Sequence, residues 1–263
     1  MSDPRRPWPT PLRVMGILNV TPDSFWSASR FENVDHAIAA GTKMYDAGAW
    51  AVDVGGESTR PGAVPVSVDE EIARVIPVVA ELAGHGVVSV DTRNHDVAEA
   101  AVGVGAQIIN DVSGRLYGLA ARLRVGYVSM HAHTVPVIAR DPPAYVDVCG
   151  EISAFVRRRA DAAASSGAQP VWIDPGIGFG KSAVDNVKLL RHLPALCEAG
   201  YPVLFGVSRK TFLGSITGRD VADRMAASLA TVAPAWTAGV DVIRVHDVAE
   251  TLDTIAVLEA IWA

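Results

Sequence analysis

The sequence predicts a single-domain α/β fold, a (β/α)8 TIM barrel. Eight short apolar runs rich in Val and Ile follow one another along the chain, and segments with helical spacing of apolar residues separate them. Apolar runs that do not alternate with polar residues are typical of parallel strands covered on both faces. The chain has 263 residues and no Gly/Ser/Pro-rich linker divides it. One barrel of this kind takes roughly 250 residues, so the length fits a single domain.

The predicted strands carry polar residues at or near their C-terminal ends. We expect strands at residues 14–19, 51–58, 87–91, 107–111, 127–131, 170–174, 202–210 and 242–246. The polar residues are Asn19, Asp53 to Ser58, Asp91, Asn110, Asp111, His131, Asp174, Ser208 to Lys210, Arg244 and His246. Because the C-terminal strand ends of such a barrel build its active site, we expect these side chains to converge and the chain to be an enzyme.

Helices are expected between and after the strands. Their predicted ranges are 34–47, 67–82, 95–104, 118–123, 145–165, 184–199, 221–238 and 249–262. Ser67 followed by Glu70 fits a capping box at the start of the second helix. Pro77 should kink that helix or lie close to its first turn. The run Arg157 to Arg159 is expected on a solvated helix face.

Composition and charge exclude several classes of protein. The formal net charge of −6 and the isoelectric point near 5.6 argue against a general nucleic-acid binder. Cys149 and Cys197 are too few for a disulfide framework, and we expect both to be reduced. No apolar stretch reaches the roughly 20 residues of a membrane span, so a cytoplasmic protein is expected. Residues 1–12 should form an exposed arm that contains several prolines, and residues 13–263 the barrel.

The carboxylates at the strand ends indicate a ligand with several N–H donors. Asp91 and Asp174 bring two carboxylates to the site, and Asn110 adds an amide. Buried carboxylates need partners, and a heterocycle such as the guanidine-containing pterin ring would supply them. The alternative is that both carboxylates pair with Lys210 and Arg244 in a structural network, and the two interpretations are compatible.

A second group of candidates is cationic. Lys210, Arg244, His246 and Arg60 could hold a diphosphate, and Asn19 could bind a divalent metal beside it. In isolation His246 could equally be a core histidine. No Cys/His cluster has zinc-site spacing, and no third ligand is evident beside His131 and His133.

The Gly-rich stretch 174–181 lacks the spacing of a nucleoside-triphosphate loop. We expect its glycines to shape a loop that places Phe179 over the site.

Seven motifs occur in order along the chain. They are MGILNVTPDSF (15–25), DVGGESTRPG (53–62), SVDT (89–92), INDVSG (109–114), DPGIGFGK (174–181), SRKTFLG (208–214) and RVHDV (244–248). Together they resemble dihydropteroate synthase of folate biosynthesis. The resemblance implies a transferase, usually dimeric, that joins 6-hydroxymethyl-7,8-dihydropterin diphosphate to p-aminobenzoate and releases pyrophosphate. Mg²⁺ is the implied cofactor, and the implied partners are small-molecule substrates rather than nucleic acid or membrane.

The resemblance also implies a role for each candidate residue. The pterin would be held by Asp91, Asn110, Asp174 and Lys210, with Met130 and Gly206 lining its slot and Arg244 stacking on it. The diphosphate would be bound by Thr59, Arg60, Arg244 and His246, with Mg²⁺ on Asn19. The p-aminobenzoate site would be formed by Ser58, Pro61, Phe179 and Thr211. The implied catalytic residues are Asp91, Lys210 and Arg244.

Three segments depart from the family pattern. Residues 26–29 read Trp-Ser-Ala-Ser where Ser-Asp-Gly-Gly is usual, the run after His131 is atypical, and the helix after residue 114 lacks its usual Asp-Pro start. The first departure leaves open a paralogue that uses a different arylamine, resists sulfonamides or condenses poorly. A pterin-dependent methyltransferase is a further alternative, but a methyl carrier has no diphosphate for the cationic motifs to neutralise. The helices at 221–238 and 249–262 are the expected dimer face.

Overall fold

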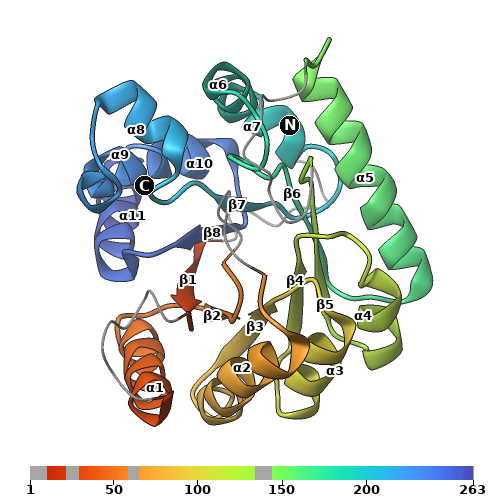
Figure 1. The fold of residues 1–263 in the computed structure, drawn as a ribbon. Helices are drawn as coiled ribbons and strands as arrows, with labels where there is room; N and C mark the ends of the chain where they lie inside the picture. The colour runs from red at the N-terminus through yellow and green to blue at the C-terminus, as the bar shows by residue number, and fades with distance from the viewer. Residues whose placement is uncertain (1–10, 22–29, 59–64, 134–143, 263) are drawn as a thin grey trace.

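The computed structural model describes residues 11–21, 30–58, 65–133 and 144–262. Most of the predicted N-terminal arm, residues 1–10, lies outside the described residues. Within them, strands alternate with helices along the chain, and the helices surround the strands (Figure 1).

The eight strands form one parallel sheet. They are β1 (Arg13–Asn19), β2 (Ala51–Gly55), β3 (Val87–Asp91), β4 (Ile108–Asp111), β5 (Gly126–Met130), β6 (Val171–Asp174), β7 (Leu204–Gly206) and β8 (Val242–Val245). Their order is β6-β5-β4-β3-β2-β1-β8-β7, and every pairing is parallel. A parallel bridge between Ile173 and Val203 joins the two outermost strands, which closes the sheet into a barrel. The predicted fold class is confirmed.

The helices lie close to their predicted positions, with three differences. They are α1 (Arg30–Asp46), α2 (Val68–Leu82), α3 (His95–Gly103), α4 (Tyr117–Leu123), α5 (Val148–Ser166), α6 (Ala183–Arg191), α7 (Leu193–Cys197), α8 (Thr211–Thr217), α9 (Met225–Leu229), α10 (Val232–Ala238) and α11 (Val248–Trp262). The predicted helix 184–199 is divided into α6 and α7, with Pro194 in the first turn of α7. The predicted helix 221–238 is divided into a short 3₁₀ turn, α9 and α10. No helix was expected at α8.

The start of α2 follows the capping prediction in part. The Ser67 side chain accepts a hydrogen bond from the Glu70 backbone N–H, as a capping residue should. The Glu70 carboxylate instead pairs with Arg74, one helical turn further on. Pro77 lies inside α2 rather than in its first turn.

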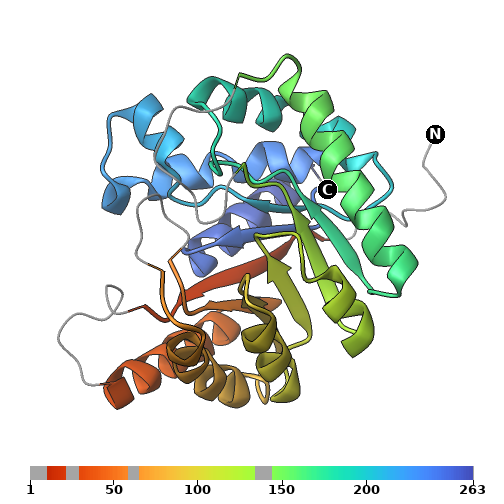
Figure 2. The ribbon, with the colours of Figure 1, turned by 45° about the vertical axis from the view of Figure 1, so that its right-hand side comes forward.

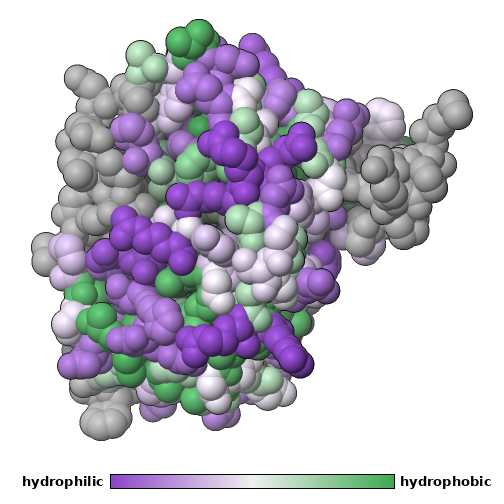
Figure 3. Space-filling view, turned by 90° about the vertical axis from the view of Figure 1, so that its right-hand side faces the viewer, coloured by the Kyte–Doolittle hydropathy of each residue, from purple (hydrophilic) through white to green (hydrophobic). Residues whose placement is uncertain are grey.

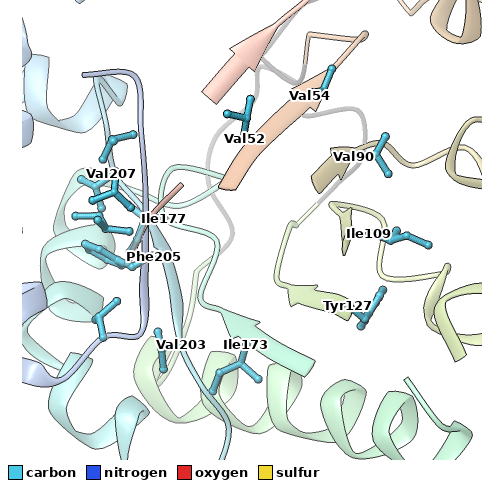
Figure 4. Packing of buried hydrophobic residues seen from close by; sticks show 14 of the residues in the cluster. Val52, Val54, Val90, Ile109, Tyr127, Ile173, Ile177, Val203, Phe205 and Val207 are labelled. Carbon is cyan, nitrogen blue, oxygen red and sulfur yellow. The ribbon is translucent and has the colours of Figure 1, made fainter. Parts of the chain in front are cut away.

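Two layers of apolar side chains surround the strands. Within the barrel, the packed residues are Met15, Ala51, Ile108, Val128, Trp172, Leu204 and Val242. Outside it, alternate strand residues such as Val52, Val54, Val90 and Phe205 pack against the helices (Figure 4). Figure 2 shows the parallel strands from the side, with helices on the outside of the barrel. Because successive side chains along a strand point to opposite faces, only every second strand residue reaches the barrel interior.

The expectation for the arginine run on α5 is correct for two of its three members. Arg157 and Arg158 are exposed. The side of the molecule seen in Figure 3 carries many hydrophilic side chains. Arg159 is half-buried: it stacks over Phe155 at 4.7 Å and donates to the carbonyl oxygen of Gly114. It therefore fastens α5 to the turn after β4 instead of lying on the solvated face.

Both cysteines are free, as expected, and each lies in a helix. Among the described helices, none has the length and apolar character needed to cross a membrane.

Candidate functional site

The barrel interior changes from apolar to polar towards the C-terminal ends of the strands. Five predicted site residues each follow an interior apolar residue by two positions and so share its face: Asn110, Met130, Asp174, Gly206 and Arg244. Asn19 and Asp91 end β1 and β3. The alternation that builds the barrel therefore gathers these predicted residues at one end, the end where active sites of this fold lie.

Arg244 connects two carboxylates from different strands. Its Nε donates to Asp53 Oδ2 at 2.6 Å, and its Nη2 donates to Asp91 Oδ2 at 2.7 Å. Asn110 Nδ2 donates to the same Asp53 oxygen at 2.8 Å. The alternative in which Asp91 pairs with Arg244 is thus part of the structure. These four side chains form one network, although they are as much as 191 residues apart in the sequence.

Burial dominates the electrostatics of this network. The pKa of Asp91 is raised to about 7, chiefly by burial and also by the nearby carboxylates of Asp53 and Glu71, against the lowering effect of Arg244. Burial also raises the pKa of Asp174. It lowers the pKa of Lys210 to about 8, although Asp174 and Asp91 favour the ammonium form. The site therefore holds acids that bind protons readily beside a lysine that loses its proton readily.

The loop after β6 is held in place from within by a buried lysine. Asp174 Oδ1 accepts from the Gly176 backbone N–H at 2.7 Å, which orients that carboxylate. Lys181 is 7% exposed. Its Nζ donates to the carbonyl oxygens of Gly176, His131 and Phe179 at 2.6, 3.2 and 3.4 Å. Gly176 has a positive φ of 65°, and a Cβ there would meet the His131 carbonyl oxygen at 1.8 Å.

Lys210 and Phe179 lie against each other across the site. The Lys210 ammonium lies 4.1 Å from the centroid of the Phe179 ring, within the range of a cation–π contact. It also donates to the carbonyl oxygen of Ile177. The expected place of Phe179 beside the strand ends is consistent with this contact.

Lys210 is presented by a turn with unusual backbone geometry. Arg209, its neighbour, has a positive φ of 57°, which is unfavourable for a residue with a Cβ. The Arg209 guanidinium forms an ion pair with Asp247, and its backbone N–H donates to Ser228 Oγ at 2.8 Å. These contacts hold Arg209 in its left-handed conformation. Lys210 follows directly and is the N-cap residue of α8.

His246 lies just after β8, at the same end of the barrel. Its backbone N–H donates to Ser208 Oγ at 3.1 Å, and its ring Nδ1 lies 3.0 Å from the same oxygen. It is half-buried and so is not a core histidine.

Two predicted strand-end residues do not join the others. Asp111 faces the helices, where its oxygens accept from the backbone N–H groups of Ser113 and Leu116 and from the Tyr127 hydroxyl. The His131 ring packs on Phe155 of α5 at 4.7 Å, and burial lowers its pKa to about 3. Both residues point away from the barrel interior because each directly follows an interior-facing residue. The expectation that they converge with the other polar residues is wrong.

A second network supports the end of β3 from behind. Glu71 of α2 is fully buried and accepts from Thr92 Oγ1 at 2.7 Å and from Asn94 Nδ2. Glu57, which follows β2, forms a two-pronged ion pair with Arg93 at 2.6 and 2.8 Å. These contacts fasten the segments that leave β2 and β3 to each other, next to Asp91.

The predicted p-aminobenzoate and diphosphate residues are described only in part. Ser58 is half-buried directly after β2, and Thr211 is exposed at the first position of α8. Thr59, Arg60 and Pro61 lie outside the described residues. So do the atypical residues 26–29 and most of the atypical run after His131.

The described residues could bind a divalent metal only together with ligands from the substrate and water. Asn19 is half-exposed at the end of β1. Its Oδ1 lies 3.9 Å from the position a Cβ on Gly55 would take, so the amide is at the strand ends. Among the described ranges, no group of three or more His, Cys, Asp or Glu residues could hold a metal ion. One amide oxygen does suit Mg²⁺ when substrate phosphates and water supply the other ligands.

Three residues that shape the site were given no role of their own from the sequence, although Asp53 and Arg209 lie within the strand-end runs whose side chains were expected to converge. Asp53, Lys181 and Arg209 contact predicted site residues directly or through the backbone. Asp53 carried a usable signal, since a buried strand has no reason to hold a carboxylate in its middle. Lys181 carried no such signal, because polar residues in loops are ordinarily exposed.

Comparison with known proteins agrees with this geometry. The family model described as pterin binding enzyme matches residues 15–246. The dihydropteroate synthase of Neisseria meningitidis serogroup C is 42% identical over 261 residues, which cover 95% of this chain and 92% of that protein. That of Mycobacterium leprae is 40% identical over 270 residues, covering 95% and 93%.

Solved structures give the same relationship. The dihydropteroate synthase of Xanthomonas albilineans with 4-aminobenzoic acid has a TM-score of 0.88 and 46% identity, and covers 96% of this chain and 93% of that one. The same enzyme in complex with 7,8-dihydropteroate has a TM-score of 0.85 and 44% identity, covering 96% and 94%. With this fold, this site and these relatives, the chain belongs to the dihydropteroate synthase family of pterin-binding enzymes, the transferases of folate biosynthesis.

Proposed function

We propose that this chain condenses 6-hydroxymethyl-7,8-dihydropterin diphosphate with p-aminobenzoate to give 7,8-dihydropteroate and pyrophosphate. The observation that carries the proposal is the network at the barrel mouth, where Arg244 joins Asp53 and Asp91 and where Asp174 and Lys210 lie close by. Relatives at 44–46% identity have been solved with 4-aminobenzoic acid and with 7,8-dihydropteroate. These matches favour the synthase over an altered paralogue or a methyltransferase.

The pterin ring is proposed to lie on the polar network. Ionised Asp91 and Asp174 accept hydrogen bonds from ring N–H groups, and the Asn110 amide completes the edge. Lys210 donates to a ring acceptor, while Met130 and Gly206 line the slot. At Gly206 a Cβ would lie 3.7 Å from Arg244 Cβ, so a glycine leaves room for a flat ring above the guanidinium.

The chemical step is a displacement at the pterin methylene carbon. Its C–O bond breaks with the electron pair leaving on pyrophosphate, and the arylamine nitrogen forms the new C–N bond and then loses a proton to solvent. Positive charge develops at the methylene as pyrophosphate departs, and the carboxylates of Asp91 and Asp174 stabilise it. Arg244 and His246, with Thr59 and Arg60, bind the departing diphosphate. Mg²⁺ on Asn19 would neutralise part of its charge.

Positioning accounts for the second substrate. The arylamine is already nucleophilic, so the protein must hold it in line rather than deprotonate it. Phe179, Thr211, Ser58 and Pro61 are the proposed contacts.

The reaction is tested by mass-detected product formation from the pterin diphosphate, p-aminobenzoate and Mg²⁺, with pyrophosphate release followed in parallel. Dihydropteroate and pyrophosphate are expected at equal amounts, and omission of Mg²⁺ should lower the rate. Pyrophosphate release or pterin binding without dihydropteroate would contradict the proposal and favour a paralogue with altered arylamine use. Ser27→Asp, which restores the family's usual carboxylate in the first loop, then tests whether that loop limits p-aminobenzoate use.

The rate is expected to follow a bell-shaped pH profile. Asp91 accepts the ring N–H groups only when ionised, and its pKa is raised to about 7, so kcat/KM for the pterin diphosphate should rise as pH increases through 7. Lys210 donates as an ammonium, and its pKa is lowered to about 8, so kcat/KM should fall above 8. A profile measured at saturating p-aminobenzoate should therefore peak between these values. A flat profile between about pH 6 and 9 would contradict these two roles.

A homodimer is proposed to form through the C-terminal helices. Large apolar side chains are exposed on this part of the chain, namely Ile216, Val221, Met225, Val257, Ile261 and Trp262. Such a concentration favours a protein interface. Sedimentation of the wild type and of Ile261→Glu would test it, with the variant expected to be monomeric. The cytoplasm is the proposed location, in keeping with two free cysteines.

A further inference from the structure

Asp53 lies in the middle of β2, where it is fully buried. Its neighbours Val52 and Val54 point outward to the helices (Figure 4), so Asp53 faces the barrel interior. It is in register with Ile17 of β1 and Ser89 of β3, two positions before the Gly55–Asp91 pair. Asp53 therefore lies one layer beneath the strand ends that carry Asp91.

Asp53 holds two of the proposed pterin residues at once. A single oxygen, Oδ2, accepts from Arg244 Nε at 2.6 Å and from Asn110 Nδ2 at 2.8 Å. Arg244 has a long, flexible side chain with five donors, and its orientation must be fixed before it can serve a ligand. The contact to Asp53 fixes it from below, at the nitrogen nearest its aliphatic chain.

The division of Arg244 between two carboxylates determines what Asp91 has left for a substrate. A guanidinium that met Asp91 alone would use two nitrogens on both carboxylate oxygens, the preferred fork geometry. Because Asp53 takes Nε, Arg244 reaches Asp91 through Nη2 and Oδ2 only, at 2.7 Å. Arg244 therefore engages one oxygen of the Asp91 carboxylate rather than both.

We propose that Asp53 is a positioning residue for the pterin half of the reaction. It anchors Arg244 Nε and Asn110 Nδ2 beneath the pterin ring and so keeps Asp91 available to the ring N–H groups. Asp53 itself does not touch the substrate. This inference rests on the proposed function and adds to it a role for Asp53, which the sequence placed among the strand-end polar residues without naming a partner or a function.

The second oxygen of Asp53 makes an almost isosteric test possible. Oδ1 is buried and, within the described residues, has no hydrogen-bond partner. An asparagine can keep its carbonyl oxygen on Arg244 and Asn110 and place its NH₂ where Oδ1 was, so Asp53→Asn removes the charge and retains the packing. Asp53→Ala instead removes the acceptor of both donors.

The charge of Asp53 also acts on Asp91. The groups that shift the pKa of Asp91, besides burial, are Arg244 and Lys210, which lower it, and Asp53 and Glu71, which raise it. Asp53→Asn removes one of the charges that raise the pKa of Asp91. Of the two carboxylates that Arg244 contacts, it leaves only that of Asp91. Both effects lower the pKa of Asp91. A residue that only fills space would not produce this shift.

The experiment compares the wild type, Asp53→Asn and a control, Ser89→Ala, in steady-state assays across pH. Ser89 is a fully buried interior neighbour in register with Asp53 and carries no charge. For Asp53→Asn we expect KM for the pterin diphosphate to rise about tenfold, KM for p-aminobenzoate to stay within about twofold, and the acid limb of kcat/KM to move to lower pH. Asp53→Ala should lower kcat/KM for the pterin diphosphate about 100-fold. Ser89→Ala should leave the acid limb unmoved.

Two results would overturn the inference. One is an Asp53→Asn enzyme with unchanged pterin KM and an unchanged acid limb, and the other is an equal rise of both KM values, which indicates general loosening. If the wild type forms no dihydropteroate, the proposed function fails by itself. Calorimetric binding of 6-hydroxymethylpterin to both proteins across pH then decides the inference, with weaker binding and the same acid shift expected for Asp53→Asn.

Discussion

Replacing Arg244 by methionine is expected to lower kcat/KM for the pterin diphosphate by about 10³-fold or more and the free energy of unfolding by about 3–5 kcal/mol. The first effect follows because Arg244 is the proposed diphosphate and ring contact. The second follows because the substitution leaves Asp53, fully buried, and Asp91, 16% exposed at its side chain, without their shared cation. Two nearby carboxylates then face each other in the barrel.

The pH dependence of the stability loss in Arg244→Met identifies the cause of that loss. With Arg244 gone, burial and repulsion from the carboxylate of Asp53 raise the pKa of Asp91 further above its unfolded value. Groups with raised acid pKa values destabilise the folded state as pH rises, so Arg244→Met should lose more stability at pH 8 than at pH 5. Urea unfolding at both values measures this. Loss of similar size at the two pH values would contradict the network as its source.

Two further variants make the interpretation specific. Arg244→Lys keeps a charge but cannot place two nitrogens on two carboxylates in the same way, so its loss should fall between those of methionine and wild type. Arg122→Met breaks the ion pair between Arg122, whose side chain is 56% exposed, and Glu99, whose side chain is 44% exposed. That surface change should leave activity unaltered and cost less than about 1 kcal/mol. A kcat/KM of Arg244→Met within about tenfold of the wild-type value would contradict the proposed role of Arg244.

The arrangement of Arg244 also illustrates what a sequence can predict about such a site. Arg244 follows Val242 by two positions, and Asp174 follows Trp172 in the same way. The period of a strand alone predicts that these side chains face the interior with their apolar partners. The same rule, applied strictly, would have separated Asp111 and His131 from the group, because each is one residue out of phase.

Asp53 was harder to place because its contacts are entirely non-local. It meets Asn110 and Arg244, which are 57 and 191 residues away in the sequence. Strand order and register decide which polar residues meet in the interior, and no local pattern encodes them. The sequence could mark Asp53 as a buried carboxylate in need of a partner, but not name the partner.

The C-terminal helices show the limit of local patterns in another way. The segment 221–238 has helical spacing throughout, yet it is divided into a 3₁₀ turn, α9 and α10. Arg224 lies at one division, where its side chain donates to the carbonyl oxygens of Arg219 and Arg209. It thereby supports the turn that presents Lys210. The tertiary requirement of the site overrides the helical propensity of the segment.

Replacing Lys181 by methionine is expected to lower the free energy of unfolding by about 2–4 kcal/mol and to raise KM for p-aminobenzoate about tenfold. The methionine fills much of the same space but donates no hydrogen bonds. The His131 carbonyl oxygen, which Lys181 Nζ reaches at 3.2 Å, would lose this donor in a buried place. The Gly176 carbonyl oxygen would lose its 2.6 Å contact with the lysine and keep the hydrogen bond from the Phe179 backbone N–H. Phe179, whose carbonyl oxygen is the third acceptor, would no longer be held over the site.

A second lysine in the same region provides the matched control. Lys188 is seven positions further on in α6, and its side chain is 56% exposed and pairs with Asp185 at 3.5 Å. Lys188→Met should change stability by less than about 0.5 kcal/mol and leave both KM values unaltered. The difference between the two variants measures burial and hydrogen bonding, because the substitution is identical. If both variants unfold at the same urea concentration and bind p-aminobenzoate alike, the loop after β6 is held by its glycines and by Asn186, and Lys181 only fills the space beneath it.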